Sequence, residues 1–331
     1  MSSIDYWESK VLKSLDPVVR NSTLVKVNEA KIKEVASWMA YEEFAKPDGS
    51  SLFDFGDEPD FIMDLTFTVN TMNFAFTNFD TGIKYETDYQ GRRYSDSEAM
   101  MADLHRAYTE GIPFFDGEYQ AKMTRADLEQ VFRGTIEMPM LDERVQIFNE
   151  VGAILLEKYQ GKWHNFVRSC APRLYSDGNG ILERLTSEFP RFADVSDYNG
   201  SEIQMYKLPQ LGIWSLHLAL MPRKVWALED AHLLTAFADY IVPVALRVMG
   251  IFEYSPKLEN QINSLVEIPR DSLAEVEIRA NSIYAIARLT DEINALRGNL
   301  EPLLMPQVDF RLWKFYHATH WPHHLTKTVM Y

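Results

Sequence analysis

Apolar residues follow a helical spacing along most of this chain and a strand-like spacing near its beginning. Positions three and four residues apart are apolar in many segments, and this period predicts helices. These segments are 28–43, 99–108, 128–133, 141–159, 163–170, 180–189, 213–220, 230–250, 256–265, 272–296 and 309–317. Residues 65–76 (LTFTVNTMNFAF) alternate instead and are rich in β-branched and aromatic side chains, which predicts a strand. Residues 83–94 predict a hairpin that turns at Gln90 and Gly91.

Polar residues and a glycine mark several expected helix ends. Ser95 with Glu98, and Thr124 with Asp127, have the spacing of a capping box at a helix start. Gly250 has the position of a C-terminal cap. These signals place helix boundaries without assigning any chemistry to the residues.

Together these elements predict a mainly α protein of the α+β class. The strand signals all precede residue 112, and a chain of 331 residues is long enough for two lobes. We expect an N-terminal lobe with a small sheet at 1–112 and a helical domain at 113–331, packed as one compact unit. Residues 46–51 (KPDGSS) predict a loop within the first lobe.

Composition narrows the class of protein. Hydrophobic residues make up 46% of the chain and aromatic residues 13%, which supplies a core and flat surfaces for a planar ring. The single cysteine, Cys170, excludes an internal disulfide framework and fits a reducing compartment. The first residues lack the pattern of a signal peptide, and no apolar run approaches about eighteen residues. We expect a cytoplasmic monomer without membrane contact.

The charge balance argues against an extended nucleic-acid surface. The chain carries 48 acidic and 33 basic residues, a formal net charge of −15, and has no run rich in Lys or Arg. Proteins that grip DNA or RNA neutralise phosphates with such residues. The sequence therefore favours a small-molecule partner and no direct nucleic-acid binding.

The main candidate for chemistry combines the segment Lys207-Leu-Pro-Gln-Leu-Gly-Ile-Trp-Ser215 with Asp239. The segment predicts a hairpin between two helices, where Gly212 would let the backbone approach a phosphate and Lys207 would add a charge. An ordinary turn fits the same residues. Asp239 is expected at the head of the next helix, as a cap, as a carboxylate that stabilises a sugar cation, or as both.

This combination resembles the core of the helix-hairpin-helix base-excision glycosylases, in which a Leu-Pro-x-x-Gly hairpin precedes an essential Asp. The resemblance implies cleavage of an N-glycosidic bond. Members with lyase activity carry a nucleophilic Lys two positions after the hairpin glycine, and here that position is Trp214. Schiff-base chemistry is therefore not supported, and hydrolysis by water remains.

The histidine-rich tail is a weaker candidate. His317, His320, His323 and His324 have a density that suits metal ligands. Pro322 interrupts any shared helix face, and no carboxylate or cysteine partner is near in sequence, so we expect a packed or exposed tail and no metal.

Two further motifs admit a structural and a functional interpretation. Glu275 and Arg279 are four residues apart and predict an intrahelical ion pair. Residues 70–76 (NTMNFAF) place amides and aromatic rings at alternating positions, as in a sheet core or in a wall that stacks on a ring.

Read in order, segments along nearly the whole chain resemble the queuosine salvage family, the queuosine 5′-phosphate N-glycosylases. The resemblance rests on residues 70–76 (NTMNFAF), 110–113 (EGIP), 138–144 (MPMLDER), 155–158 (LLEK), 189–195 (FPRFADV), 206–210 (YKLPQ), 237–240 (FADY), 275–279 (EVEIR) and 309–313 (DFRLW), and on the aromatic Tyr331. Two positions depart from the family pattern: Ile241 stands where relatives have Arg, and residues 50–64 lack a His.

The resemblance implies hydrolysis of queuosine 5′-monophosphate to queuine and ribose 5-phosphate, with Asp239 as the catalytic carboxylate and no metal or organic cofactor. It places Lys207 and Tyr240 at the phosphate and ribose, and Phe237, Asp309, Asn73 and Phe74 at the base. The acidic balance of the chain fits the cationic amine of queuine. Two other functions remain as alternatives: a DNA-repair glycosylase of the helix-hairpin-helix type, and a protein that binds a modified base without turnover.

Overall fold

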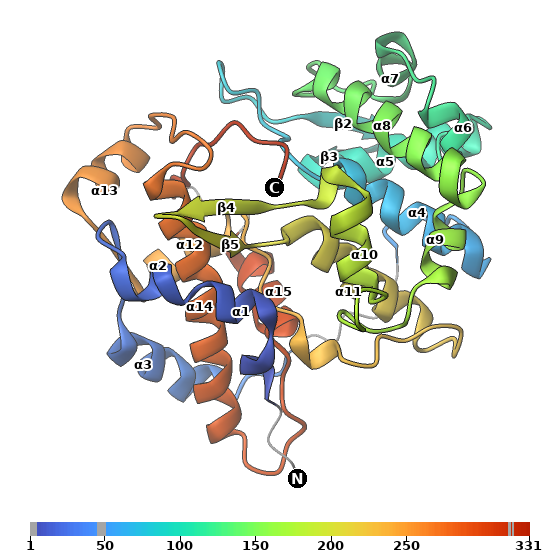
Figure 1. Cartoon of the computed structure of the whole chain (residues 1–331). Helices are drawn as coiled ribbons and strands as arrows, with labels where there is room; N and C mark the ends of the chain where they lie inside the picture. Colours follow the sequence, from blue (N-terminus) through green and yellow to red (C-terminus); the bar gives the residue numbers. More distant parts are fainter. Residues whose placement is uncertain (1–4, 45–50, 317–318, 320) are drawn as a thin grey trace.

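Helices dominate the described chain, which comprises residues 5–44, 51–316, 319 and 321–331 of a computed structural model (Figure 1). The α-helices are α1 (Lys10–Ser14), α2 (Asp16–Asn21), α3 (Glu29–Met39), α4 (Pro59–Met72), α5 (Asp96–Thr109), α6 (Gly117–Gln120), α7 (Arg125–Val131), α8 (Leu141–Tyr159), α9 (Trp163–Ser169), α10 (Ile181–Glu188), α11 (Lys207–Leu220), α12 (Val242–Val248), α13 (Pro256–Asn263), α14 (Leu273–Leu296) and α15 (Met305–Tyr316). Short 3-10 helices are η1 (Tyr6–Glu8), η2 (Pro190–Phe192) and η3 (Ala231–Leu233).

The described strands form two-stranded antiparallel sheets. Strand β1 (Val25–Val27) pairs with β6 (Phe252–Tyr254), β2 (Glu86–Tyr89) with β3 (Arg92–Ser95), and β4 (Val195–Tyr198) with β5 (Ser201–Gln204). The mainly α, α+β class expected from the sequence is confirmed. The predicted hairpin is confirmed as β2–β3, with Gln90 and Gly91 at its turn.

Helix α14 forms the axis of the first hydrophobic core and packs against α2, α3, α12 and α15 (Figure 1). Because partners surround it, every residue from Glu275 to Ile283 is buried, where a surface helix would bury only one stripe. A second core gathers α4, α9, α10 and α11 around Trp163. The third core draws residues from both sides of residue 112, and the division into lobes at that point remains a prediction.

The predicted strand at residues 65–76 is wrong, because most of this segment belongs to α4. Pro59 stands in its first turn, where a missing N–H costs nothing. The helix is buried on several sides, so apolar side chains occupy positions that a one-sided helix would leave polar. The buried Thr71 hydroxyl donates to the carbonyl of Phe67 within the same helix. This hydrogen bond satisfies a polar side chain that the strand prediction placed on a sheet face.

The predicted hairpin at residues 207–215 is also wrong. Residues Lys207–Leu220 form the continuous helix α11, which begins directly after Tyr206 in the left-handed region at φ 47°. Pro209 lies in the first turn and is tolerated there. A Cβ on Gly212 would lie 3.3 Å from Phe67 Cε1, so this glycine permits the close packing of α11 on α4 rather than an approach to phosphate.

The helix predicted at 230–250 is shorter than expected. After η3 the chain runs without regular structure to Ile241, and α12 covers only Val242–Val248 because Pro243 starts it. Gly250 follows α12 at φ 70°, as predicted for a C-terminal cap.

The predicted capping boxes have different outcomes. The box of Thr124 with Asp127 is confirmed. The box at Ser95 is wrong, since the Ser95 side chain makes no capping hydrogen bond. The predicted loop at 46–51 lies outside the described residues, apart from Ser51. None of the helices in the described ranges combines the length and apolarity needed to cross a bilayer.

Candidate active site

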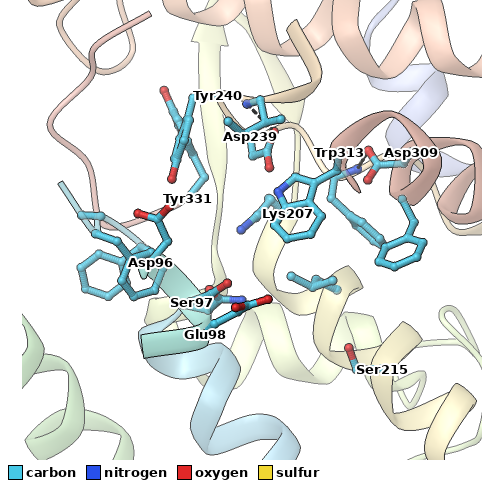
Figure 2. A pocket seen from close by; sticks show the side chains of 18 of the residues that line it. Asp96, Ser97, Glu98, Lys207, Ser215, Asp239, Tyr240, Asp309, Trp313 and Tyr331 are labelled. Atoms are coloured by element: carbon cyan, nitrogen blue, oxygen red, sulfur yellow. Dashed lines mark hydrogen bonds between the residues drawn. The ribbon is translucent and has the colours of Figure 1, made fainter. Parts of the chain in front are cut away.

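A cavity of about 340 Å³ lies where α11, α15, the start of α5 and the loop before α12 meet (Figure 2). All of the residues predicted for the site line it: Asn73, Phe74, Lys207, Phe237, Asp239, Tyr240 and Asp309. These residues come from segments between the end of α4 and α15. Side chains that are far apart in sequence therefore meet in one cavity. Their individual roles remain predictions.

Asp239 is held at the head of α12 by main-chain hydrogen bonds. Its Oδ1 accepts the N–H groups of Ile241 at 2.8 Å and Val242 at 3.0 Å. Both bonds use the same oxygen, so the carboxylate is fixed in orientation while the side chain faces the cavity (Figure 2). Asp239 is buried, at 7% exposure, and lies two residues before Ile241, the N-cap of α12, so it is not the terminal residue of that helix.

Lys207, the first residue of α11, places a buried cation near Asp239. Burial lowers the pKa of the Lys207 amine, and the negative charges of Asp239 and Asp309 oppose that shift without reversing it. Conversely, burial raises the pKa of Asp239, while Lys207 and the two N–H donors oppose the rise. Each charge therefore favours the ionised form of the other in a poorly solvated space.

Asp309 provides a second buried carboxyl group, and both burial and a neighbouring negative charge raise its pKa. Its Oδ2 accepts the backbone N–H of Phe237 at 2.9 Å. Burial raises the pKa of Asp309 well above the ordinary value, and the neighbouring charge of Asp239 raises it further. Burial therefore disfavours the ionised form of Asp309, whereas Lys207 and the N–H groups of Ile241 and Val242 favour the ionised form of Asp239.

Two buried arginines hold the turn that follows α4. Arg144 donates to the carbonyls of Met72, Phe74 and Ala75, and its guanidinium lies 4.1 Å from the centroid of the Phe74 ring. Arg191 lies 4.8 Å from the same ring. Burial lowers the pKa of each guanidinium to about 9. This scaffold presents Asn73 and Phe74 as one wall of the cavity.

The C-terminal segment forms part of the enclosure. The His323 ring packs 4.7 Å from the Tyr240 ring, and His324 Nε2 lies 3.1 Å from the Tyr331 hydroxyl. Tyr331 itself lines the cavity. His317 and His320 lie outside the described residues, and among the residues that are described no group of three potential metal ligands occurs.

Sequence reasoning missed the acidic edge across the cavity from Asp239. Asp96, Ser97 and Glu98 line it from the start of α5, and Lys84 pairs with Asp96 at 2.7 Å (Figure 2). Their only local signal was the apparent capping pattern, which suggested a structural role. The left-handed φ of Asp96, 54°, is visible only in the structure.

The fold and the site define a mainly α protein with a cavity lined by two buried carboxyl groups, Asp239 and Asp309, and by Lys207. The profile described as queuosine salvage protein matches residues 54–331. The chain belongs to this family.

Relatives in bacteria and eukaryotes extend the match. A protein of Sphaerobacter thermophilus named queuosine 5′-phosphate N-glycosylase/hydrolase is 30% identical over 324 residues, which is 97% of each chain. A protein of Schizosaccharomyces pombe with the same name is 27% identical and covers 92% of this chain and 90% of its own. One from Mus musculus is 29% identical over 75% of this chain and 74% of its own.

Proposed function

We propose that this protein is an N-glycoside hydrolase that converts queuosine 5′-monophosphate to queuine and ribose 5-phosphate. Family membership supports the substrate. The observation that supports the chemistry is the oriented, buried carboxylate of Asp239 inside a cavity of about 340 Å³. Such a carboxylate stabilises the positive charge that develops on a ribose as its glycosidic bond breaks.

In the proposed reaction, the bond between C1′ and the base nitrogen breaks and its electron pair leaves with the base. Water supplies the oxygen that becomes attached to C1′, and its proton balances the charge on the departing base. Asp239 acts either by attacking C1′ or by directing the water, and in both cases its anion faces the sugar cation. A protonated Asp309 donates a hydrogen bond to the base, which favours departure of the base.

The remaining predicted residues hold the substrate. Lys207 provides positive charge for the phosphate and ribose, with Tyr240 beside it. Phe237, Asn73 and Phe74 enclose the planar base. In this proposal Ile241, which lines the cavity at the position where the family resemblance implies Arg, makes an apolar contact with the substrate.

Comparison of wild type with Asp239→Asn tests the proposal directly. Each protein is incubated with queuosine 5′-monophosphate, and queuine and ribose 5-phosphate are quantified by mass spectrometry. We expect release by the wild type and a loss of roughly a thousandfold or more in the variant. Substantial release by Asp239→Asn would remove this carboxylate from the central role, and binding without any release by the wild type would favour the non-catalytic alternative.

The DNA-glycosylase alternative has a separate test, because its binding to duplex DNA would weaken steeply with salt. The acidic pocket gives that alternative no support. A cytoplasmic location, a monomeric state, independence of cofactors and the absence of direct nucleic-acid binding remain predictions.

A further inference from the structure

A buried ion pair lies beneath the cavity and has no assigned role in the proposed chemistry. Arg279 of α14 donates through Nη1 to Asp194 Oδ1 at 2.9 Å and through Nη2 to Asp194 Oδ2 at 2.7 Å. Both residues are 2% exposed. Burial opposes the charge on Asp194, but Arg279 outweighs it and the pKa of Asp194 is lowered. Two parallel bonds between planar groups fix the orientation of both.

One side of this pair holds the start of α11. Asp194 Oδ2 accepts the main-chain N–H of Lys207 at 3.0 Å. The backbone carbonyl of Asp194 accepts the N–H groups of Met205 at 3.0 Å and Tyr206 at 3.2 Å. Asp194 therefore fixes the left-handed Tyr206 and the residue that follows it, and this determines where the Lys207 side chain enters the cavity.

The other side of the pair holds the wall that carries the carboxylate. Arg279 Nε donates to the carbonyl of Ala238 at 3.0 Å, immediately before Asp239. The guanidinium also lies 4.4 Å from the centroid of the Tyr331 ring, which lines the cavity. A single side chain thus contacts the backbone next to Asp239 and a wall of the pocket. The ion pair expected from sequence with Glu275 is present at 3.5 Å, but it is not the closest partner.

We propose that the Asp194–Arg279 pair positions the Lys207 amine relative to the Asp239 carboxylate. Neither Asp194 nor Arg279 lines the cavity, so both act through the residues that they hold. A rigid connection matters because a displacement of about 1 Å in a reacting group costs about 100-fold in rate. This inference rests on the proposed hydrolase function for its kinetic consequences, but the effect of the pair on Lys207 is measurable without turnover.

The measurement that needs no turnover is the pKa of Lys207, taken from the pH dependence of its acetylation by acetic anhydride and read by peptide mass spectrometry. Asp194→Asn removes the closer of the two carboxylates that face Arg279 and leaves only Glu275 at 3.5 Å, so the charge of Arg279 is less compensated and the pKa of Lys207 should fall. Arg279→Gln leaves Asp194 as an unbalanced anion, so the pKa should rise. General loosening of the fold would move both variants in the same direction, toward a solvated lysine, and that result would overturn the proposal.

Kinetics with queuosine 5′-monophosphate provide the second readout. We expect kcat to fall roughly 10- to 100-fold in both variants, with the pH profile displaced in opposite directions. Glu277→Gln is the matched control: Glu277 is a buried carboxylate on the same helix, and it accepts N–H groups of Thr23, Leu24 and Val25 outside the cavity. This control should lower Tm while leaving kcat and the pH profile unchanged. An equal loss of kcat in Glu277→Gln would overturn the proposal.

Either single variant leaves a buried charge without its partner and risks misfolding. The double variant Asp194→Asn/Arg279→Gln removes both charges and keeps planar groups of similar size. It should return the pKa of Lys207 close to the wild-type value while kcat stays low, because an amide pair holds the two backbones less firmly. Full wild-type kcat in the folded double variant would show that the pair has no positioning role. If the wild type released no queuine, the proposed function would fail, whereas a shift of the Lys207 pKa in the same direction in both single variants would still overturn this inference.

Discussion

The backbone N–H of Phe237 donates to the Asp309 carboxyl at 2.9 Å, which ties α15 to the loop that carries Asp239. Burial and the charge of Asp239 both raise the pKa of Asp309, so this contact involves a carboxyl group that stays protonated to an unusually high pH. The contact therefore links the stability of the loop to the protonation state of the site.

Asp309→Asn should make the fold more stable than the wild type at alkaline pH. A carboxyl group whose folded-state pKa is raised contributes stability below its unfolded pKa, near 3.9, and loses that contribution as pH rises through the folded value. Asparagine stays neutral and keeps an acceptor for Phe237. The Tm of Asp309→Asn minus that of the wild type should therefore become more positive from pH 5 to pH 9. A constant difference would contradict a raised pKa at Asp309.

Lys207→Met should move the acidic limb of the pH–rate profile to higher pH. The Lys207 charge lowers the pKa of Asp239, so its removal lets burial raise that pKa further and reduces the ionised fraction near neutrality. The profile is measured from queuine release at saturating substrate. Lys207→Arg keeps the charge and should leave the acidic limb in place. A common shift in both variants would point to lost packing rather than lost charge.

Arg144→Lys should destabilise the protein and weaken substrate binding. Arg144 donates to four backbone carbonyls, including Pro139 at 2.9 Å and Ala75 at 2.8 Å, and the single amine of lysine cannot reach all of them. Each buried carbonyl left without a donor costs about 1–3 kcal/mol. Denaturant unfolding should show a loss of at least that size, and KM should rise because Phe74 is no longer fixed. An unchanged KM in a destabilised variant would confine Arg144 to a structural role.

Sequence patterns were sufficient to predict elements whose signals are local. They also identified the residues of the site in their order along the chain. The predicted helix at 141–159 coincides with α8, because its apolar period is one-sided. All of the predicted site residues line one cavity, since the family resemblance carried their order along the chain. The resemblance could not supply the distances between them.

The failures share a tertiary cause. Helix α4 resembles a strand in sequence because its apolar residues serve two cores, Ile62, Met63 and Phe67 in the second and Leu65 and Met72 in the third, and no single-chain pattern records those neighbours. The start of α11 was interpreted as a hairpin because Pro209 and Gly212 are turn residues, although one lies in a first turn and the other in a helix–helix contact. Asp96 escaped notice because its position in the pocket depends on a left-handed backbone.

Gly212→Ala tests the contact between α11 and α4 and should be destabilising despite the higher helix propensity of alanine. That propensity favours the variant by about 1 kcal/mol. However, the new Cβ would lie 3.3 Å from Phe67 Cε1 and 3.4 Å from Asn70 Cβ, and the Phe67 ring is itself packed 5.3 Å from Trp163. Overpacking of this kind costs about 1–3 kcal/mol, so a net loss of about 1 kcal/mol is expected in urea unfolding.

The same substitution at Gly152 of α8 is the matched comparison, because it brings the same gain in helix propensity. There the Cβ would meet the backbone nitrogen of Ala121 at 2.3 Å, and backbone cannot yield as a ring edge can. Gly152→Ala should therefore lose more stability than Gly212→Ala. Only Gly212→Ala should also raise KM in the folded protein, since Lys207 is the first residue of α11 and Asn73 directly follows α4. Equal stability of Gly212→Ala and the wild type would mean that α4 yields at this contact and that Gly212 is not required for the packing of α11 on α4.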